Sequence, residues 1–203
     1  FIAWPPILHV THRTFPAPQH RKALDYGCGT GGFCRKLHDI GFSVRGIDYA
    51  ESMIKIAKAN SPTSISYQVG DYHGINQKFS LITSIMVLHF ISPIEKLLSK
   101  FSDVLENQGI LVFAVFNPDW VTSCLLHNKK FCNFDSIRHP RKGYRDFGEN
   151  SHVPVYVRTA QEYDAIAKKC ALKKIMEKYP PFTKKFLSTY PIDAPTDVPE
   201  YLI

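Results

Sequence analysis

The chain lacks most of the features that mark secreted, metal-binding and membrane proteins. Its five cysteines are odd in number and scattered and form no C-x-x-C pair, so we expect neither a disulfide framework nor a zinc site. The nine histidines show no H-E-x-x-H spacing, which would place two of them on one helix face, and we expect no metal site. No stretch approaches the roughly 20 apolar residues that cross a bilayer, and no signal sequence opens the chain. We therefore expect no membrane span and a cytoplasmic location.

Acidic residues are also in deficit, because 18 of them stand against 25 lysines and arginines, which leaves a formal charge of +7. Basic proteins often bind nucleic acid or anionic surfaces. Two groups carry much of the excess: Lys168, Lys169, Lys173 and Lys174, and then Arg138, Arg141, Lys142 and Arg145. The first group has the spacing of a solvated helix face. The second lies in a predicted loop and leaves contact with nucleic acid open.

What the chain does contain is a regular alternation of short apolar runs with helical patterns. An apolar run at Lys22–Tyr26 leads into a glycine-rich turn and then a helical pattern, and the same order repeats along the chain. The predicted strands are 22–26, 43–48, 64–69, 79–84 and 109–116, and the predicted helices are 33–40, 52–59 and 93–105. This alternation predicts a doubly wound α/β fold, in which helices cover both faces of a mostly parallel sheet.

A long segment, 117–152, interrupts the alternation with glycine, proline, histidine, arginine and aromatic residues. It is too long for an ordinary connection, and long connections in compact domains are often functional. We expect one domain over 1–203, with 117–152 as a substrate-side insertion and Tyr144, His152 and Tyr156 as candidate lining groups. The predicted elements after the insertion are a strand at 153–157, a helix at 160–171, and closing strands at 172–179 and 201–203.

Two features of the first strands predict a cofactor that contains adenosine. In an open α/β sheet, ligands bind at the carboxyl ends of the strands. Gly27 and Gly29 follow the first strand, where the lack of a side chain lets backbone amides approach a ligand. Asp48 ends the second strand about 20 residues later, where a carboxylate can accept both hydroxyls of a ribose.

The glycines alone do not identify the cofactor, because Gly27, Gly29 and Gly32 also fit the G-x-G-x-x-G pattern of nicotinamide-binding folds. Asp25 separates the two interpretations. Its carboxylate, directly before the turn, would repel a pyrophosphate but attract the ammonium group of a methionine moiety. A nicotinamide oxidoreductase would usually also carry a Y-x-x-x-K pair, and the chain has none.

Residues near the next strand ends suit an adenine ring. Asp71 ends the third predicted strand, where it could accept a hydrogen bond from the adenine amine, while the backbone amide of Tyr72 could reach a ring nitrogen. Tyr49 and Met53 follow Asp48 closely, and an aromatic ring with a thioether could hold the two faces of adenine.

Five short strings then follow one another in the order typical of a known family. They are ALDYGCGTG at 23–31, GIDY at 46–49 with Met53 and Ile54, Gly70 with Asp71, VLHF at 87–90, and LENQGIL at 105–111. In combination they resemble the motifs of class I methyltransferases that depend on S-adenosylmethionine (SAM), closest to the branch with the ubiquinone and menaquinone biosynthesis enzymes. The resemblance covers roughly 23–116 and implies a Rossmann-like sheet of about seven strands whose last strand is antiparallel.

The resemblance also implies SAM as the cofactor and a role for each matching residue. Asp25 would reach the methionine amino group, Gly27 and Gly29 would pack against the methionine part, and Asp48 would hold the ribose. The remaining implied contacts are Tyr49 and Met53 on the adenine faces, Asp71 and Tyr72 at the adenine edge, and Ser84 and Ile85 beside the methyl donor. Ile85 stands where relatives often carry Asn or Asp, so one polar contact is missing there.

The predicted reaction is methyl transfer to a small-molecule acceptor. Because the sulfonium donor is intrinsically activated, the protein mainly has to align the acceptor with the methyl group and exclude water. A general base is needed if the acceptor must lose a proton, and His89, after the fourth strand, is the candidate. Alternatively, His89 packs among its apolar neighbours and has no catalytic role. Trp4 could close over the cofactor, or it could pack in the core of the protein.

Two other functions stay open at this point. An RNA methyltransferase could use the basic residues of the insertion on phosphates, although no Asn/Asp-Pro-Pro-Tyr/Phe string follows the fourth strand. A protein that binds SAM without catalysing methyl transfer would share the same cofactor motifs.

Overall fold

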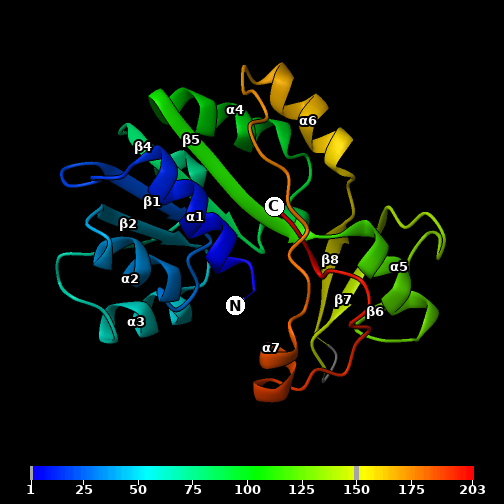
Figure 1. Cartoon of the computed structure of the whole chain (residues 1–203). Coiled ribbons are helices and arrows are strands. Elements are labelled where there is room, and N and C mark those ends of the chain that lie inside the picture. The colour runs from blue at the N-terminus through cyan, green and yellow to red at the C-terminus, as the bar shows by residue number, and fades with distance from the viewer. Residues whose placement is uncertain (1, 149–150) are drawn as a thin grey trace.

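The computed structural model describes residues 2–148 and 151–203, which form a central sheet between helices and a smaller sheet beside it (Figure 1). The central sheet has six strands in the order β3-β2-β1-β4-β5-β9. Its strands are β1 Lys22–Tyr26, β2 Ser43–Asp48, β3 Ser66–Val69, β4 Phe79–Ile85, β5 Leu105–Phe116 and β9 Tyr201–Leu202. Strands β1 to β5 pair in parallel, and β9 pairs antiparallel with β5. The predicted fold class and its antiparallel last strand are confirmed.

The strand order brings the predicted site residues to one edge of the sheet. β1 lies between β2 and β4, so the winding of the sheet reverses beside β1. The register pairs Tyr26 with Ile47 and Asp48 with Val69, so the carboxyl ends of three neighbouring strands lie side by side. The glycine turn, Asp48 and Asp71 therefore follow strand ends at the same edge.

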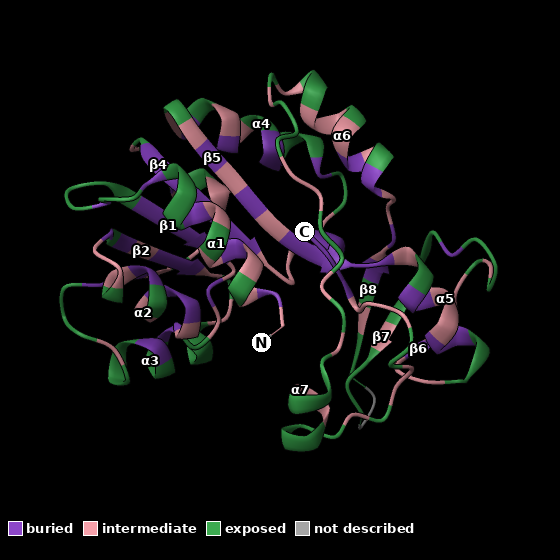
Figure 2. Cartoon of the chain, viewed as in Figure 1, coloured by how far each residue is buried: buried purple, intermediate pink, exposed green. Residues whose placement is uncertain are grey.

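Helices cover both faces because the central strands are apolar on both sides (Figure 2). Successive strand residues point to opposite faces, and Ala23 accordingly joins one core while Leu24 joins the other. The helices α1 Trp4–Thr14, α2 Gly32–Asp39 and α3 Glu51–Ala59 cover the first face, and α4 Glu95–Val104 and α6 Ala160–Lys169 cover the second. Each fully buried Leu or Ile stabilises the fold by about 1.5–3 kcal/mol relative to its exposed state.

The segment predicted as an insertion forms a layer of its own against the end of β5. It contains the helix α5 Pro118–Leu126 and the strands β6 Phe131–Cys132 and β7 Lys142–Asp146, and β8 His152–Tyr156 completes an antiparallel sheet in the order β6-β7-β8. The Asn117 side chain begins α5 by accepting a hydrogen bond from the amide of Asp119 at 3.2 Å. The predicted strand at 153–157 is therefore present as β8, in this smaller sheet.

Aromatic residues form the core of this layer. Trp120 packs parallel to Phe116 with the ring centroids 5.7 Å apart, and Phe131 meets Phe116 edge to face at 5.3 Å. Because Phe116 is the last residue of β5, this third core is continuous with the central sheet. The indole nitrogen of Trp120 also donates to the carbonyl of Pro195 at 3.0 Å, which fixes the C-terminal segment on the layer.

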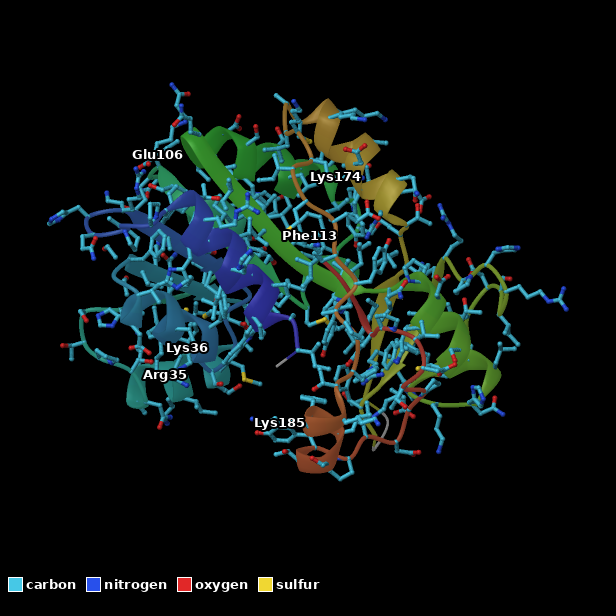
Figure 3. All side chains as sticks on the ribbon, viewed as in Figure 1. Arg35, Lys36, Glu106, Phe113, Lys174 and Lys185 are labelled. Atoms are coloured by element: carbon cyan, nitrogen blue, oxygen red, sulfur yellow. The ribbon has the colours of Figure 1, made fainter. Side chains whose placement is uncertain are left out.

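The six strands of the central sheet are close to the expected seven, and the segment 172–179, expected to be a closing strand, is not part of it. The segment is rich in lysine, and one reciprocal pair of backbone hydrogen bonds, each 2.9 Å, joins its Lys178 to Ile203, the residue after β9. A groove of about 440 Å³ separates this segment from β5. Phe113 on β5 and Lys174 on the segment line the groove from its two sides (Figure 3).

The helix α1 was not predicted, and it begins with the proline pair that follows Trp4. Proline is compatible with the first turn of a helix, where its missing N–H has no partner to lose. Ile7 and Thr11 bury one side of α1, and the Trp4 ring packs on Phe33 of α2 with centroids 5.6 Å apart. A short helix, α7 Lys184–Thr189, lies near the C-terminus. Within the described ranges, no helix combines the length and the apolar composition that a bilayer crossing requires.

Candidate active site

The glycine turn shows which of its glycines faces open space. Gly27, Gly29 and Gly31 all have positive φ values, of 73°, 53° and 75°, where a side chain is strained. A Cβ atom on Gly27 would lie 2.2 Å from a methyl carbon of Val87, and one on Gly31 would lie 2.3 Å from the hydroxyl of Tyr67. A Cβ on Gly29 would meet no atom within 4 Å. The turn is therefore packed on both sides of Gly29 and open at Gly29 itself, where a ligand can lie against the backbone.

Asp25 lies beneath this turn and is 2% exposed. Its carboxylate accepts hydrogen bonds from the hydroxyl of Thr83 at 2.8 Å and from the thiol of Cys34 at 3.3 Å. Burial raises the pKa of Asp25 to about 6, against the opposing effect of those two hydrogen bonds. A cationic ligand group above the turn would favour the ionised form, so the site suits the methionine ammonium predicted from sequence.

Asp48 fastens the turn to the end of β2. One carboxylate oxygen accepts the amide of Gly29 at 2.8 Å, and the other accepts the amide of Ala50 at 2.9 Å. Each carboxylate oxygen has two lone pairs, so both oxygens can still accept a hydrogen bond from a hydroxyl group of a ligand. Asp48 therefore holds the turn in place and keeps capacity for the two hydroxyls of a ribose.

The side chains predicted around adenine lie at the surface beside Asp48. Tyr49 is 86% exposed and Met53 is 41% exposed, so two large apolar groups face solvent next to the open side of the turn. Exposed apolar groups that gather in one place often mark a binding site. Asp71 is less available, because its carboxylate accepts the backbone amide of His73 and pairs with its ring nitrogen, both at 2.9 Å. Tyr72 stacks on the same His73 ring at 4.2 Å.

Ser84 does not present its side chain to this space. It is fully buried, and its hydroxyl donates to the carbonyl of Tyr26 at 3.0 Å, which ties β4 to β1. Ile85 is only partly buried and packs against the first core. Met86 follows with φ of 62° and packs between the first and third cores. The wall beside the turn is therefore formed after Ser84, by apolar side chains.

His89 lies close to the turn through Val87, the residue that fills the space beside Gly27. It sits in the short helix η2 Leu88–Phe90 with 1% of its surface exposed, and its ring centroid is 4.0 Å from that of Phe116. Neither ring nitrogen has a hydrogen-bond partner among the described residues. Burial, and then the charges of Arg145 and Arg158, lower the pKa of His89 to about 3. The imidazole is neutral at neutral pH, with one nitrogen able to accept a proton.

The residues of the insertion divide between the two faces of the small sheet. The register pairs Arg145 with Phe131 and Val153, and these side chains share the face of the small sheet that packs on Phe116. Tyr144 and Tyr156 alternate with that set and lie on the opposite face. The strand pattern around 145 could have suggested Arg145, but its facing partners become visible only once β7 has been assigned.

The basic residues of the insertion form no single phosphate-binding face. Arg141 pairs with Glu162 of α6, and Lys142 lies over the ring of Tyr156 at 5.7 Å. Arg145 lies over the aromatic core instead, 5.0 Å from the ring centroid of Phe131. Arg138 is exposed. Within the part of the chain that the structure describes, no His, Cys, Asp or Glu side chains gather as a metal site.

Comparisons with known proteins agree with this geometry. A family model described as a methyltransferase domain matches residues 5–170 of the chain. The ubiquinone biosynthesis O-methyltransferase of Bartonella tribocorum is 29% identical over 105 residues, which are 49% of this chain and 42% of that protein. The chain thus matches less than half the length of that curated relative.

Solved structures share the fold. A SAM-dependent methyltransferase from Mesorhizobium loti superposes with a TM-score of 0.73 at 21% identity, covering 100% of this chain and 95% of that chain. The magnesium protoporphyrin IX methyltransferase of Synechocystis PCC 6803, solved with bound SAH, gives a TM-score of 0.63 at 14% identity, over 89% of this chain and 76% of that chain. The family match spans most of the sequence, and the chain therefore belongs to the methyltransferase-domain family, the class I SAM-dependent methyltransferases.

Proposed function

We propose that this protein binds SAM at the glycine turn and transfers its methyl group to a small-molecule acceptor. The observation that carries the proposal is the Asp48 carboxylate, which organises the turn and retains lone pairs beside the open side of Gly29. The curated relative named above is an O-methyltransferase of ubiquinone biosynthesis, and this favours a small molecule as the acceptor here too.

The residues around the turn fit the parts of SAM. Asp48 would accept the ribose hydroxyls, and Tyr49 and Met53 would cover the adenine ring. Asp25 would attract the ammonium group from below the turn, where burial raises the pKa of its carboxyl to about 6 and a bound cation would lower it again. Asp71 and Tyr72 would reach the adenine edge, with Asp71 sharing its carboxylate with His73. Bound SAM supplies an electrophilic methyl group on a sulfonium sulfur.

His89 is the proposed general base. An acceptor hydroxyl or amine would donate its lone pair to the methyl carbon, the sulfur–methyl bond would break, and the acceptor proton would pass to a ring nitrogen of His89. Both nitrogens have no partner among the described residues, so the acceptor would supply the hydrogen bond that the buried imidazole lacks. A pKa of about 3 makes His89 a weak base before the acceptor binds.

The α5 and β6-β7-β8 layer is the proposed acceptor side of a single domain. It packs on Phe116 at the end of β5, next to His89 and on the edge where the turn lies. We also propose a cytoplasmic location, because the five cysteines are free thiols and reduced thiols are typical of that compartment.

The test is transfer of labelled methyl groups from SAM to small molecules of a cell extract, compared between three proteins. The unaltered protein should label an acceptor in the small-molecule fraction. Asp48→Ala should lose this activity, because the turn loses its anchor and the ribose its acceptor. Glu51→Gln, an exposed change at the start of α3, is the matched control and should keep it. Labelled RNA, or SAM binding without any labelled product, would overturn the proposal in favour of the other two functions.

A further inference from the structure

Two arginines, Arg145 on β7 and Arg158 just after β8, lie near His89, and the cofactor motifs do not account for either of them. Arg145 lies on β7, directly opposite Phe131 and Val153 on the neighbouring strands. Its guanidinium carbon lies 5.0 Å from the ring centroid of Phe131 and 5.7 Å from that of Phe116. His89 packs on the same Phe116 ring at 4.0 Å. The ring of Phe116 therefore contacts both the imidazole of His89 and the guanidinium group of Arg145.

Arg158 reaches the same region from the end of β8. It donates a hydrogen bond to the carbonyl of Ile91 at 2.9 Å, and Ile91 directly follows the short helix that carries His89. Its guanidinium carbon lies 5.6 Å from the ring centroid of Tyr156 and 5.8 Å from that of Tyr163. The charge of Arg158 also acts on His89, where it lowers the pKa together with that of Arg145.

These cations carry unused hydrogen-bond donors. One terminal nitrogen of Arg145 and one of Arg158 are buried without a hydrogen-bond partner among the described residues, as are both ring nitrogens of His89. In the same part of the chain, no carboxylate lies within the 4.0 Å ion-pair distance of either arginine. Glu200 is the acid whose charge acts most on Arg145, and burial raises the pKa of the Glu200 carboxyl.

A buried charged donor without a partner is costly, and a ligand that accepts from it is one way in which a native protein can satisfy it. Two guanidinium groups suit a carboxylate, because their planar donors match its two oxygens and the resulting hydrogen bonds are charge-assisted. The surrounding rings of Phe90 and Phe116, both packed against His89, suit a flat apolar body.

We propose that the methyl acceptor is an aromatic carboxylate, held through its carboxylate by Arg145 and Arg158 with its ring against the aromatic residues beside His89. This inference rests on the proposed function and adds the chemical class of the substrate. The carboxylate would also offset the charges of Arg145 and Arg158, which add to burial in lowering the pKa of His89, so the correct acceptor would make His89 a stronger base.

Benzoate and benzamide test the proposal, because they share one shape and differ by one charge. Each is titrated into the protein saturated with S-adenosylhomocysteine, and binding is followed by the fluorescence of Trp120, which stacks on Phe116. The Trp4→Phe background leaves Trp120 as the one tryptophan, since the chain has two. We expect benzoate to bind about tenfold more tightly than benzamide, as charge-assisted hydrogen bonds require.

The preference should disappear in Arg145→Met and in Arg158→Met and persist in Arg138→Met, an exposed change that removes the same charge from the same layer. Equal affinities of benzoate and benzamide in the unaltered site would overturn the proposal without any variant, so a variant that fails to fold leaves the test intact. Calorimetric binding of S-adenosylhomocysteine separates the two proposals. If it binds and benzoate shows no preference, this inference alone fails, whereas if it does not bind, the proposed function fails first.

Discussion

Alanine should destabilise the fold more at Gly27 than at Gly29, but it should weaken cofactor binding more at Gly29 than at Gly27. Gly27 and Gly29 have similar positive φ values, 73° and 53°, so alanine pays a similar backbone cost at both, about 1–2 kcal/mol. Part of this is offset by about 0.4–1 kcal/mol, because alanine reduces the conformational entropy of the unfolded chain. At Gly29 no further cost arises, because the new methyl group enters open space, and the net loss of stability should be about 1 kcal/mol.

At Gly27 the methyl group would overlap Val87, whose nearest carbon lies 2.2 Å from the new atom. Overpacking typically costs another 1–3 kcal/mol, so roughly 2–4 kcal/mol should be lost in all. For a domain of this size, the thermal unfolding temperature should fall by roughly 2–4 °C for Gly29→Ala and roughly 4–16 °C for Gly27→Ala. Differential scanning calorimetry measures both, and Val87→Ala should recover much of the Gly27→Ala loss in a double-mutant cycle.

Affinity for S-adenosylhomocysteine should show the reverse order when measured well below both unfolding temperatures. Gly29→Ala places a methyl group where the ligand lies and should weaken binding at least about tenfold, the effect of a lost or displaced contact of about 1.4 kcal/mol. Gly27→Ala should weaken it less, because its methyl group faces Val87. If Gly27→Ala proved the more harmful to binding and the less harmful to folding, the assignment of the open side of the turn would be wrong.

Three further predictions concern titratable groups. The pKa of Asp25 is raised from 3.8 to about 6 in the folded protein. The free energy of unfolding should therefore be highest below pH 4 and should fall by about 3 kcal/mol as the pH rises through 6. In Asp25→Asn, denaturant unfolding at pH 4 and pH 7 should no longer show this difference. An unchanged pH profile in that variant would show that Asp25 is not the group responsible. Because the pKa of His89 is about 3, its ring-proton NMR signal, assigned by its loss in His89→Gln, should not move between pH 5 and pH 8. A titration midpoint near 6.5 would contradict the burial of His89 beside two cations. In Asp48→Asn the side-chain amide nitrogen would face the N–H of Gly29 or Ala50, and the loss of that hydrogen bond should cost about 1–2 kcal/mol of stability. The thermal unfolding temperature should fall by roughly 2–8 °C. An unchanged unfolding temperature would mean that Asp48 does not anchor the turn.

The central sheet could be predicted from sequence because its strands are buried on both faces. Such strands are short segments without charged residues, as in β4, and they alternate with helices whose apolar positions recur at helical spacing. The position of Asp48 followed from the same pattern, since the last residue of a parallel strand lies at the ligand-binding edge. The hydrogen bonds of Asp48 to the turn were not predictable, because they depend on the conformation at Gly29.

The residues missed by the sequence argument depend on contacts between distant segments. Segment 172–179 was expected to form a closing strand, but it is rich in lysine, and one reciprocal pair of backbone hydrogen bonds to Ile203 leaves it outside the sheet. Arg145 is one of several basic residues in a loop-like stretch, and only the pairing of β7 with β6 and β8 turns it toward Phe116. Ser84 was predicted beside the methyl donor from its motif position, whereas its hydroxyl is used between β4 and β1.

All of the other proposals depend on the binding of SAM at the glycine turn, and calorimetric titration with its product measures this binding directly. S-adenosylhomocysteine and NADH should be titrated separately into the unaltered protein at one pH and ionic strength. We predict saturable binding of S-adenosylhomocysteine with one site per chain and no heat from NADH. Binding of NADH, or no binding of S-adenosylhomocysteine by the folded protein, would contradict the account.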